Sequence, residues 1–356
     1  MEDIYSVNKI MYHPEILCKI KNNEQPYPIQ IHLMPDNRCL HNCNTCSYRI
    51  PKNKNNQLFD SKSFIPKEKM LSLLKDFKEI GVKAIENTGG GESLLYPYKE
   101  IMYEKIIEYG FDYALVTNGT LLTEDLSKLI APKMSWARIS IDAGNEKTYS
   151  RTRNAPKSDF KIALNAISLL RKYAKNPQFK LGVGFVINNE NYNEIYKACK
   201  IFKDMGADNV RISAVFHPQG IDYFNQKSIN KGIHLSSLAE ELNDESFTVY
   251  NLFNERILNL KHRIQDYEFC GTKEVLCVIG GDCNVYLCCS LAFNKRGLIG
   301  SIQNQSFKSL WDSKEKQKMF RDFNAKEKCK CFCLYEKRNK FFNELLFNKP
   351  YHINFI

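Results

Sequence analysis

Short apolar segments alternate with longer amphipathic segments between residues 28 and 215, and this alternation most constrains what the chain can fold into. Six segments are short and rich in β-branched or other apolar residues, as strands are: Ile29–Met34, Ala84–Thr88, Tyr113–Thr117, Ala137–Ile141, Lys180–Ile187 and Asn209–Val215. Five segments between them carry apolar residues at three- and four-residue spacing, as helices do: Lys67–Ile80, Tyr98–Tyr109, Thr123–Ile130, Phe160–Tyr173 and Tyr192–Met205. Strands that alternate with helices predict a parallel α/β fold.

Capping residues support the predicted helices. Three helical segments end on a glycine, at Gly81, Gly110 and Gly206, and each glycine suits a left-handed C-cap. Thr123 and Asn191 precede acidic residues at the start of two other segments, and we predict that both are N-caps.

Polar segments follow each of the first five predicted strands. A repeated strand-then-helix unit forms either a barrel or an open doubly wound sheet, and in both folds ligands bind at the carboxyl ends of the strands. The five polar segments, in chain order, are CLHNCNTC, NTGGGES, TNGT, SIDAG and FVINNEN. We therefore expect them to meet on one rim and to form the functional site.

Cys39, Cys43 and Cys46 lie in the first of these segments. An odd triplet cannot pair internally as disulfides, and the chain has no signal peptide and no apolar run of about 18 residues that would cross a membrane. We therefore expect a cytoplasmic protein with reduced thiols. Three thiolates can bind a four-iron cluster and leave the fourth iron open to a small molecule. The alternative is a zinc site with His41 as the fourth ligand.

The ordered set of segments resembles the motifs of the radical S-adenosylmethionine enzymes over roughly residues 28–215. CLHNCNTC resembles the cluster loop of that family, GGGES its GGE motif, TNGT and SIDAG its third and fourth strand ends, and GVGFVINNEN its fifth strand beside the adenine. Thr45 departs from the usual bulky residue before the last cysteine, and Ser93 stands where proline commonly follows GGE. The resemblance implies a partial (β/α)6 TIM-like barrel that binds a 4Fe-4S cluster and S-adenosylmethionine.

Four residues are candidates to bind the amino-acid end of S-adenosylmethionine. Gly90 and Gly91 would let the backbone approach the cofactor closely, and the Glu92 carboxylate can accept hydrogen bonds from its ammonium group. Arg153 is a candidate partner of the methionyl carboxylate, because a guanidinium matches two carboxylate oxygens; a surface ion pair is the alternative.

Three further polar residues are candidates to bind the nucleoside end. Ser140 and Asp142 lie one side-chain repeat apart on the fourth predicted strand, point the same way and could reach the ribose diol. Asn118 lies on the same predicted rim. Asp142 precedes a small residue and glycine, so a purely structural turn role is the alternative.

A second group of cysteines lies near the C-terminus, where eight of the 13 fall between Cys270 and Cys333. The runs Val275–Ile279 and Val285–Leu287 alternate as a β-hairpin does, with GGDCN as the turn, and a helical segment follows around Phe307–Phe320. This arrangement resembles the SPASM and Twitch extensions of the same superfamily, in which a hairpin and a helix bind one or two auxiliary iron-sulfur clusters.

The tail CKCFC is shorter than the cysteine run of full SPASM domains, so we predict one auxiliary 4Fe-4S cluster. The resemblance favours as ligands Cys270, Cys288, Cys331 and Cys333. Rival ligands are Cys277, Cys283, Cys289 and Cys329. A zinc site is the alternative, because these spacings also permit one.

These features divide the chain into five predicted regions. They are an N-terminal extension (1–27), the barrel (28–215), a helical connector (216–269), the SPASM/Twitch-like domain (270–333) and a C-terminal helix or tail (334–356). The formal net charge is +11. Such a charge could attract an acidic substrate, an anionic partner or a nucleic acid, or could simply be solvated surface.

The resemblance also implies a reaction. An electron donor such as flavodoxin or ferredoxin would reduce the first cluster, and the 5'-deoxyadenosyl radical released from S-adenosylmethionine would take hydrogen from a substrate carbon. We favour modification of a ribosomal peptide as the function. The alternatives are radical oxidation or rearrangement of a sugar, aminoglycoside or nucleotide, and a non-catalytic metal module that binds nucleic acid, which we consider less favoured. Activation of a glycyl-radical enzyme is disfavoured because the extra cysteines follow the barrel.

Overall fold

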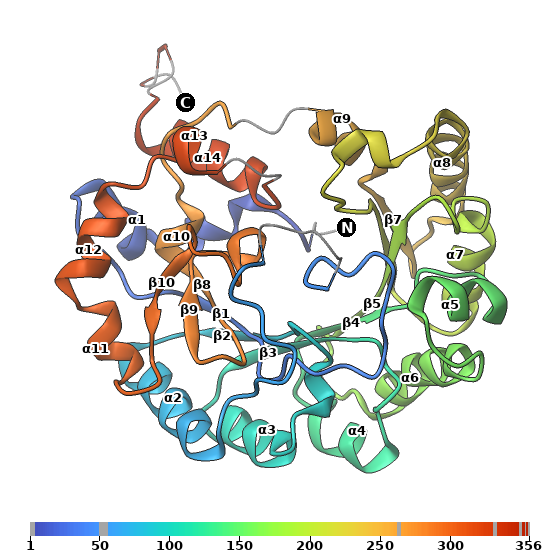
Figure 1. Cartoon of the computed structure of the whole chain (residues 1–356), viewed down its shortest axis with the longest axis horizontal. Coiled ribbons are helices and arrows are strands. Elements are labelled where there is room, and N and C mark those ends of the chain that lie inside the picture. The colour runs from blue at the N-terminus through green and yellow to red at the C-terminus, as the bar shows by residue number, and fades with distance from the viewer. Residues whose placement is uncertain are drawn as a thin grey trace.

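The computed structural model describes residues 4–49, 56–261, 265–329, 333–348, 351–352 and 354. All strands in these ranges belong to one ten-stranded sheet with the order β10-β9-β8-β1-β2-β3-β4-β5-β6-β7 (Figure 1). The six predicted strands are present as β1 Gln30–Leu33, β2 Ala84–Asn87, β3 Asp112–Thr117, β4 Trp136–Ser140, β5 Lys180–Ile187 and β6 Asn209–Ala214. Each pairs in parallel with the next along the chain, so the predicted parallel α/β barrel is confirmed.

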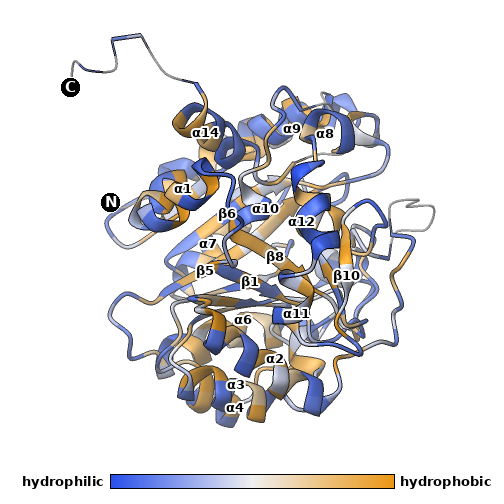
Figure 2. Ribbon diagram, turned by 90° about the vertical axis from the view of Figure 1, so that its left-hand side faces the viewer, coloured by the Kyte–Doolittle hydropathy of each residue, from blue (hydrophilic) through white to orange (hydrophobic). Residues whose placement is uncertain are grey.

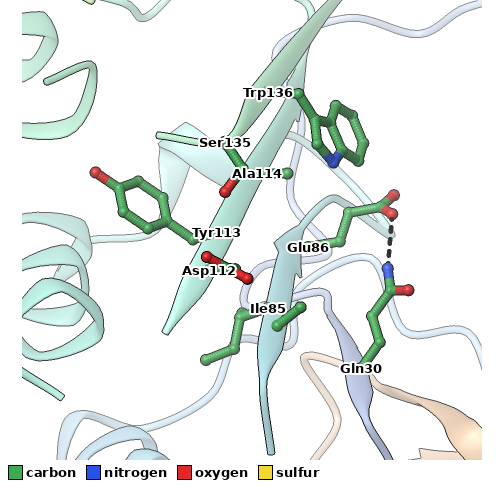
Figure 3. Close-up of a pocket in the computed structure, with 9 residues that line it drawn as sticks. Gln30, Ile85, Glu86, Asp112, Tyr113, Ala114, Ser135 and Trp136 are labelled. Carbon is green, nitrogen blue, oxygen red and sulfur yellow. Dashed lines mark hydrogen bonds between the residues drawn. The ribbon is translucent and has the colours of Figure 1, made fainter. Parts of the chain in front are cut away.

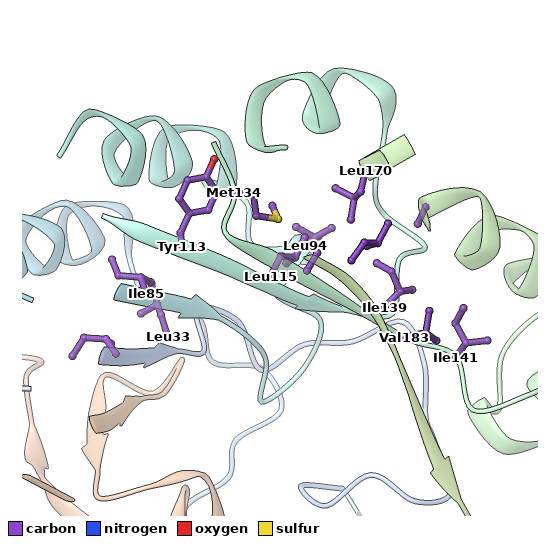
Figure 4. Packing of buried hydrophobic residues seen from close by; sticks show 14 of the residues in the cluster. Leu33, Ile85, Leu94, Tyr113, Leu115, Met134, Ile139, Ile141, Leu170 and Val183 are labelled. Atoms are coloured by element: carbon purple, nitrogen blue, oxygen red, sulfur yellow. The ribbon is translucent and has the colours of Figure 1, made fainter. Parts of the chain in front are cut away.

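Helices cover the outer face of the curved sheet (Figure 1). The five predicted helices are present as α2 Lys67–Ile80, α3 Lys99–Glu108, α4 Glu124–Ile130, α6 Asp159–Tyr173 and α7 Ile195–Asp204. Apolar side chains that leave the strands on this side form the main core, as Ile85, Leu115 and Ile139 do in Figure 4. The remaining helices are α1 Pro14–Lys21, α5 Glu146–Arg153, α8 Gln226–Ala239, α9 Phe253–Lys261, α10 Thr272–Val275, α11 Phe307–Trp311, α12 Lys314–Arg321, α13 Ala325–Lys328 and α14 Glu336–Leu346.

Short 3-10 helices occur at Val7–Tyr12, Ser93–Leu95, Gly220–Tyr223, Glu240–Leu242 and Cys289–Leu291. Figure 2 shows that many helices carry both polar and apolar residues, as helices on the surface of a core do. Within the described ranges, none of the helices combines the length and the apolar character needed to cross a membrane.

Most of the predicted caps are present. Gly81 is the left-handed C-cap of α2, with φ 82°, and the Thr123 side chain accepts a hydrogen bond from the backbone N–H of Leu126 at the start of α4. The N-cap prediction for Asn191 is wrong, because α7 begins only at Ile195. The Asn191 amide instead donates to the carbonyl oxygens of Asp142 and Val186 at 2.9 and 2.8 Å, and so ties the end of β4 to β5.

The segment 216–269 contains a strand in addition to the predicted helical structure. β7 Thr248–Asn251 pairs in parallel with β6 and extends the barrel by one strand. It has only four residues, TVYN, and only Val249 among them is buried, so neither its length nor its pattern predicts a strand.

The C-terminal hairpin continues the barrel sheet. β8 Leu276–Ile279 and β9 Asn284–Tyr286 are antiparallel, as predicted, and β10 Leu298–Ser301 pairs with β9. β8 also pairs in parallel with β1, with Gln30 opposite Leu276 and Leu33 opposite Ile279. The predicted appendage therefore shares a sheet with the barrel, and the second group of cysteines begins next to the strand that leads into the first.

Candidate active site at the carboxyl rim of the barrel

The loop that carries Cys39, Cys43 and Cys46 follows β1 directly. All three thiols are free of disulfides and half-buried. Burial raises the pKa of Cys39 to about 11, and the nearby charges of Glu92 and Cys43 act in the same direction. Burial and Cys43 also raise the pKa of Cys46. The charge of Cys43 thus acts on both other thiols, so the three cysteines lie on one short loop within electrostatic range of one another.

His41, the predicted fourth ligand of the zinc alternative, turns toward α6. Its Nε2 lies 2.9 Å from Oδ2 of Asp159, and its ring packs edge-on against Tyr149. Across the described part of the chain, no group of three or more His, Cys, Asp or Glu side chains is arranged to hold a single metal ion.

Gly90 and Gly91 pack directly against the chain that leads into the cysteine loop. A Cβ on Gly91 would lie 2.0 Å from the carbonyl oxygen of Arg38, and one on Gly90 would lie 2.4 Å from Oδ1 of Asn37 and 2.9 Å from the Phe293 ring. The backbone N–H of Glu92 donates to the same Arg38 carbonyl at 2.8 Å. The glycines therefore allow the GGE segment to pack closely against the cysteine loop, and their predicted approach to the cofactor stays a prediction.

We expect Gly91→Ala to lower the free energy of unfolding by about 3 kcal/mol, because the backbone must move to admit the new Cβ. Denaturant unfolding measures the change. Gly184→Ala is the matched control, since the nearest atom to a Cβ there is 3.6 Å away, an ordinary contact. Equal effects of the two substitutions would contradict the packing argument.

Glu92 lies at the rim between the ends of β2 and β3, and only 3% of its surface is exposed. Its carboxylate accepts hydrogen bonds from the Thr117 hydroxyl at 2.5 Å and from the backbone N–H groups of Leu94 and Asn118 at 3.0 and 2.9 Å. Burial raises its pKa, while these hydrogen bonds and the charge of Arg153 oppose the shift. A carboxylate held this firmly is oriented before any ligand arrives.

Arg153 joins the cysteine loop to the end of β4. Its guanidinium lies 2.6 Å from Oδ2 of Asp142 and donates to the Cys43 sulfur at 3.8 Å. The other Asp142 oxygen accepts from the backbone N–H of Val186 at 2.7 Å. Arg153 is therefore part of a buried ion pair. The surface ion pair that we gave as the alternative for Arg153 is not present in the part of the chain that the structure describes. Each Asp142 oxygen thus has one partner within the chain, and a carboxylate oxygen can accept a second hydrogen bond, so the predicted contact with a ribose diol stays a prediction.

The other two predicted polar residues also lie at the rim. Asn118 follows β3, and its side-chain oxygen accepts from the backbone N–H and the hydroxyl of Thr120 at 2.9 and 2.7 Å. Ser140 is half-buried at the end of β4 and lies opposite Gly184 of β5. The predicted rim residues therefore come together, while their roles toward S-adenosylmethionine stay predictions.

Sequence reasoning missed the acidic residues that hold the rim loops. Glu194 accepts hydrogen bonds from the backbone N–H of Gly144, from the Asn145 amide at 2.7 Å and from the Thr148 hydroxyl at 2.5 Å, and so fixes the SIDAG segment. The only signal was the polar character of the segment after β5, which does not identify the partners.

A second missed group lies inside the barrel. His32 Nδ1 lies 2.9 Å from the Cys289 sulfur, and His32 Nε2 lies 3.2 Å from Oε2 of Glu86. Burial alone would lower the pKa of His32, but Cys289 and Glu86 raise it to about 9. Figure 3 shows a pocket beside Glu86, where Gln30 donates to the carboxylate. This pocket lies at the end of the strands opposite the cysteine loop, so it is not part of the rim.

Two of the four favoured auxiliary ligands meet at one asparagine. The Asn339 side chain accepts from the Cys270 sulfur and donates to the Cys333 sulfur, both at 3.7 Å. Burial raises the pKa of Cys270 to about 11, and Cys333 adds to the shift. Cys288 lies next to Cys289 at the end of the hairpin, and Cys331 lies outside the described residues.

Two of the rival ligands lie elsewhere. Cys277 is fully buried on β8 in the main apolar core, opposite Ile31 of β1. Cys283 lies in the hairpin turn, with φ 58°. This left-handed conformation is one that glycine adopts more readily than a residue with a side chain.

A parallel partial barrel with a three-thiol loop at its carboxyl rim defines a cluster-binding α/β barrel. The sequence profile of the Radical SAM superfamily matches residues 34–218, and that of the SPASM iron-sulfur cluster-binding domain matches residues 270–333. The chain belongs to the Radical SAM superfamily and carries a C-terminal SPASM domain. This membership brings with it a 4Fe-4S cluster and S-adenosylmethionine as cofactors, together with auxiliary iron-sulfur binding.

The chain aligns with only part of the length of its curated relatives. GTP 3',8-cyclase from Staphylococcus carnosus is 29% identical over 217 residues, which cover 57% of this chain and 60% of the relative. S-adenosylmethionine-dependent nucleotide dehydratase from Thermoplasmatales archaeon is 32% identical over 110 residues, which cover 30% and 38%. The chain thus spans less than two thirds of the length of these relatives.

Solved structures share the fold over most of the chain. Streptococcus suis SuiB bound to the precursor peptide SuiA has a TM-score of 0.62 and 12% identity, and the match covers 91% of this chain and 74% of SuiB. Native anSMEcpe with bound AdoMet has a TM-score of 0.60 and 18% identity, and the match covers 89% and 96%. At these identities the likeness extends to the fold alone.

Proposed function

We propose that the chain cleaves S-adenosylmethionine reductively and uses the resulting 5'-deoxyadenosyl radical to take hydrogen from a carbon of a peptide substrate. The observation that carries this proposal is the link between the cysteine loop and the rim. The buried guanidinium of Arg153 donates to the Cys43 sulfur and pairs with Asp142, while Glu92 influences Cys39 from the neighbouring loop.

The residues at the rim fit the cofactors of the family. Cys39, Cys43 and Cys46 would hold the cluster, and the Arg153 guanidinium, which donates to the Cys43 sulfur, would help to orient their loop. When bound, the reduced cluster supplies the electron that breaks a carbon-sulfur bond of S-adenosylmethionine. Glu92, which is already fixed by three hydrogen bonds, would accept from the ammonium group of the cofactor.

The C-terminal domain would hold one auxiliary cluster through Cys270, Cys288, Cys331 and Cys333. Asn339 supports this assignment because it contacts the sulfurs of Cys270 and Cys333. A donor such as flavodoxin or ferredoxin would supply the electron. The ligand assignment is a prediction that metal analysis of cysteine variants can test. The division of the chain into five regions also stays a prediction.

Two observations point to different substrates. SuiB, bound to its precursor peptide, has the same fold over most of this chain and so supports a peptide. The names of the curated relatives refer instead to GTP and nucleotides, which makes a nucleotide the second candidate. GTP and nucleotides belong to the reactions of those relatives, and for this chain each is a substrate to be tested.

We expect anaerobically reconstituted and reduced protein to form 5'-deoxyadenosine from S-adenosylmethionine, measured by liquid chromatography. Addition of the cofactor should also change the electron paramagnetic resonance spectrum of the reduced protein. Comparing the yield in the presence of a synthetic precursor-type peptide with the yield in the presence of GTP would separate the two substrate classes. Reduced, iron-loaded protein that gives neither product nor spectral change would overturn the proposal.

A further inference from the structure

Two arginines project from the inner face of the sheet, on strands β4 and β6. Ala137 and Ile139, which flank Arg138, are buried in the outer core. Val210 and Ile212 likewise flank Arg211. Successive side chains of a strand point to opposite faces, so both arginines point into the barrel.

Strand β5 lies between these arginines and carries only glycine at the matching inner positions. Arg138 is in register with Gly182, and Gly184 is in register with Arg211. A Cβ on Gly184 would lie 3.6 Å from Cδ of Arg138, so the arginine side chain lies across that glycine. β4 and β6 are about 10 Å apart, two strand spacings, and no side chain of β5 separates the two arginines.

Neither arginine has an acidic partner. In the residues that the structure describes, Arg138 and Arg211 make no ion pair and no hydrogen bond, and Nε of Arg211 is buried without a partner. Their guanidinium groups lie against aromatic rings instead, 5.6 Å from the Trp136 ring and 5.4 Å from the Tyr5 ring. The charge of Glu86 acts favourably on Arg211, but the Glu86 carboxylate makes its contacts with His32 and Gln30.

The close placement of these two guanidinium groups destabilises the fold unless an anion binds between them. Burial and the charges of Arg138 and Arg256 lower the pKa of Arg211 to about 10, which means that the site already disfavours its cations. Both side chains are half-buried, and holding like charges together in a partly desolvated site without an ion-pair partner is unfavourable. An anion between the two side chains would remove that cost, and a guanidinium binds a carboxylate or phosphate with two parallel hydrogen bonds.

We propose that Arg138 and Arg211 form an anion-binding site inside the barrel that holds a carboxylate or phosphate group of the substrate. This inference rests on the proposed function, because it assigns the anion to the molecule on which the radical acts. A peptide would offer an acidic side chain or a terminal carboxylate, and a nucleotide would offer its phosphates. A polycation such as an aminoglycoside would be repelled.

The test measures binding of radiolabelled inorganic phosphate to the anaerobically reconstituted full chain by equilibrium dialysis at constant ionic strength. We expect saturable binding to the wild type, and a loss of affinity of at least about tenfold in Arg138→Met/Arg211→Met. Arg171→Met is the matched control. Arg171 lies on α6, outside the barrel, and pairs with Asp208 at 2.6 Å, so its removal should leave phosphate binding unchanged.

Competition against bound phosphate identifies the source of the anion. GTP, a glutamate-containing peptide and the same peptide with glutamine are compared, and the one that displaces phosphate at the lowest concentration carries the preferred group. Wild-type protein that binds no phosphate saturably, or a double variant that binds it as the wild type does, would overturn the proposal.

A folding control accompanies the double variant. Arg211→Lys keeps the charge but loses the two parallel donors, so it should fold and still bind phosphate several-fold more weakly. An unchanged affinity would contradict the role of the guanidinium. Cleavage of S-adenosylmethionine by the wild type is measured separately. The absence of cleavage together with arginine-dependent phosphate binding would reject the proposed reaction and leave the anion site standing. Cleavage without arginine-dependent phosphate binding would reject the anion site and leave the proposed reaction standing.

Discussion

Replacing Cys39, Cys43 and Cys46 together by alanine is expected to abolish cleavage of S-adenosylmethionine and to lower the iron content from about eight to about four per chain, at four irons per cluster. The three thiols are the only cysteines on the described part of the loop after β1, so no other thiol of that loop can replace them. Iron and sulfide analysis after anaerobic reconstitution measures the loss, and chromatography of 5'-deoxyadenosine measures the reaction.

Two control variants make this result specific. Cys270→Ala/Cys333→Ala should lose the other half of the iron, because both residues are proposed ligands of the auxiliary cluster. Their sulfurs both contact Asn339 in the C-terminal domain. Cys18→Ala should lose none, because Cys18 is exposed on α1 and belongs to neither predicted ligand set. Formation of 5'-deoxyadenosine by the triple variant would show that the site is assigned to the wrong cysteines.

Local sequence patterns predicted the barrel well because its strands and helices are encoded locally. The segment Lys67–Ile80 has its apolar residues at helical spacing and ends on Gly81, and the helix occupies those residues. The strand Lys180–Ile187 is likewise present as predicted, since its apolar run is long enough to be recognised without its neighbours.

Pairings between distant segments could not be read in the same way. The contact between β1 and β8 joins residues that are far apart in the chain, and no local pattern marks it. For the same reason the sequence showed Arg153 and Asp142 as two separate candidates, although the structure brings them together as one ion pair. The close contact of the GGE glycines with Asn37 and Arg38 was likewise not visible in the sequence, because it joins the loops that follow two different strands.

The inner face of the sheet was the least predictable part of the site. His32, Arg138 and Arg211 lie on strands that alternate polar and apolar residues, and this alternation shows that they share a face but not what they face. Only the curvature of the sheet brings side chains from β1, β4 and β6 into one interior. The rim could therefore be predicted from loops, whereas the interior required the fold.

Arg153→Met is expected to lower the free energy of unfolding by about 3–5 kcal/mol, because it leaves the buried Asp142 carboxylate without its partner. Only 7% of Arg153 and 8% of Asp142 are exposed. Arg151→Met is the matched control on the same helix. Arg151 pairs with Glu190 at 2.6 Å, but its side chain is 50% exposed, so we expect a loss of at most about 1 kcal/mol. Denaturant unfolding of both variants measures the difference.

A double-mutant cycle separates the ion pair from the other contacts of Arg153. Each single substitution leaves one buried charge without its partner, whereas the double variant Arg153→Met/Asp142→Asn leaves none. The double variant should therefore lose less stability than the sum of the two single variants. The part that is not recovered includes the hydrogen bond to Cys43, and it should appear as a lower iron content even where the protein folds. Additive effects in the cycle would mean that Arg153 acts on the cysteine loop independently of Asp142, and an unchanged iron content would mean that the loop does not depend on Arg153.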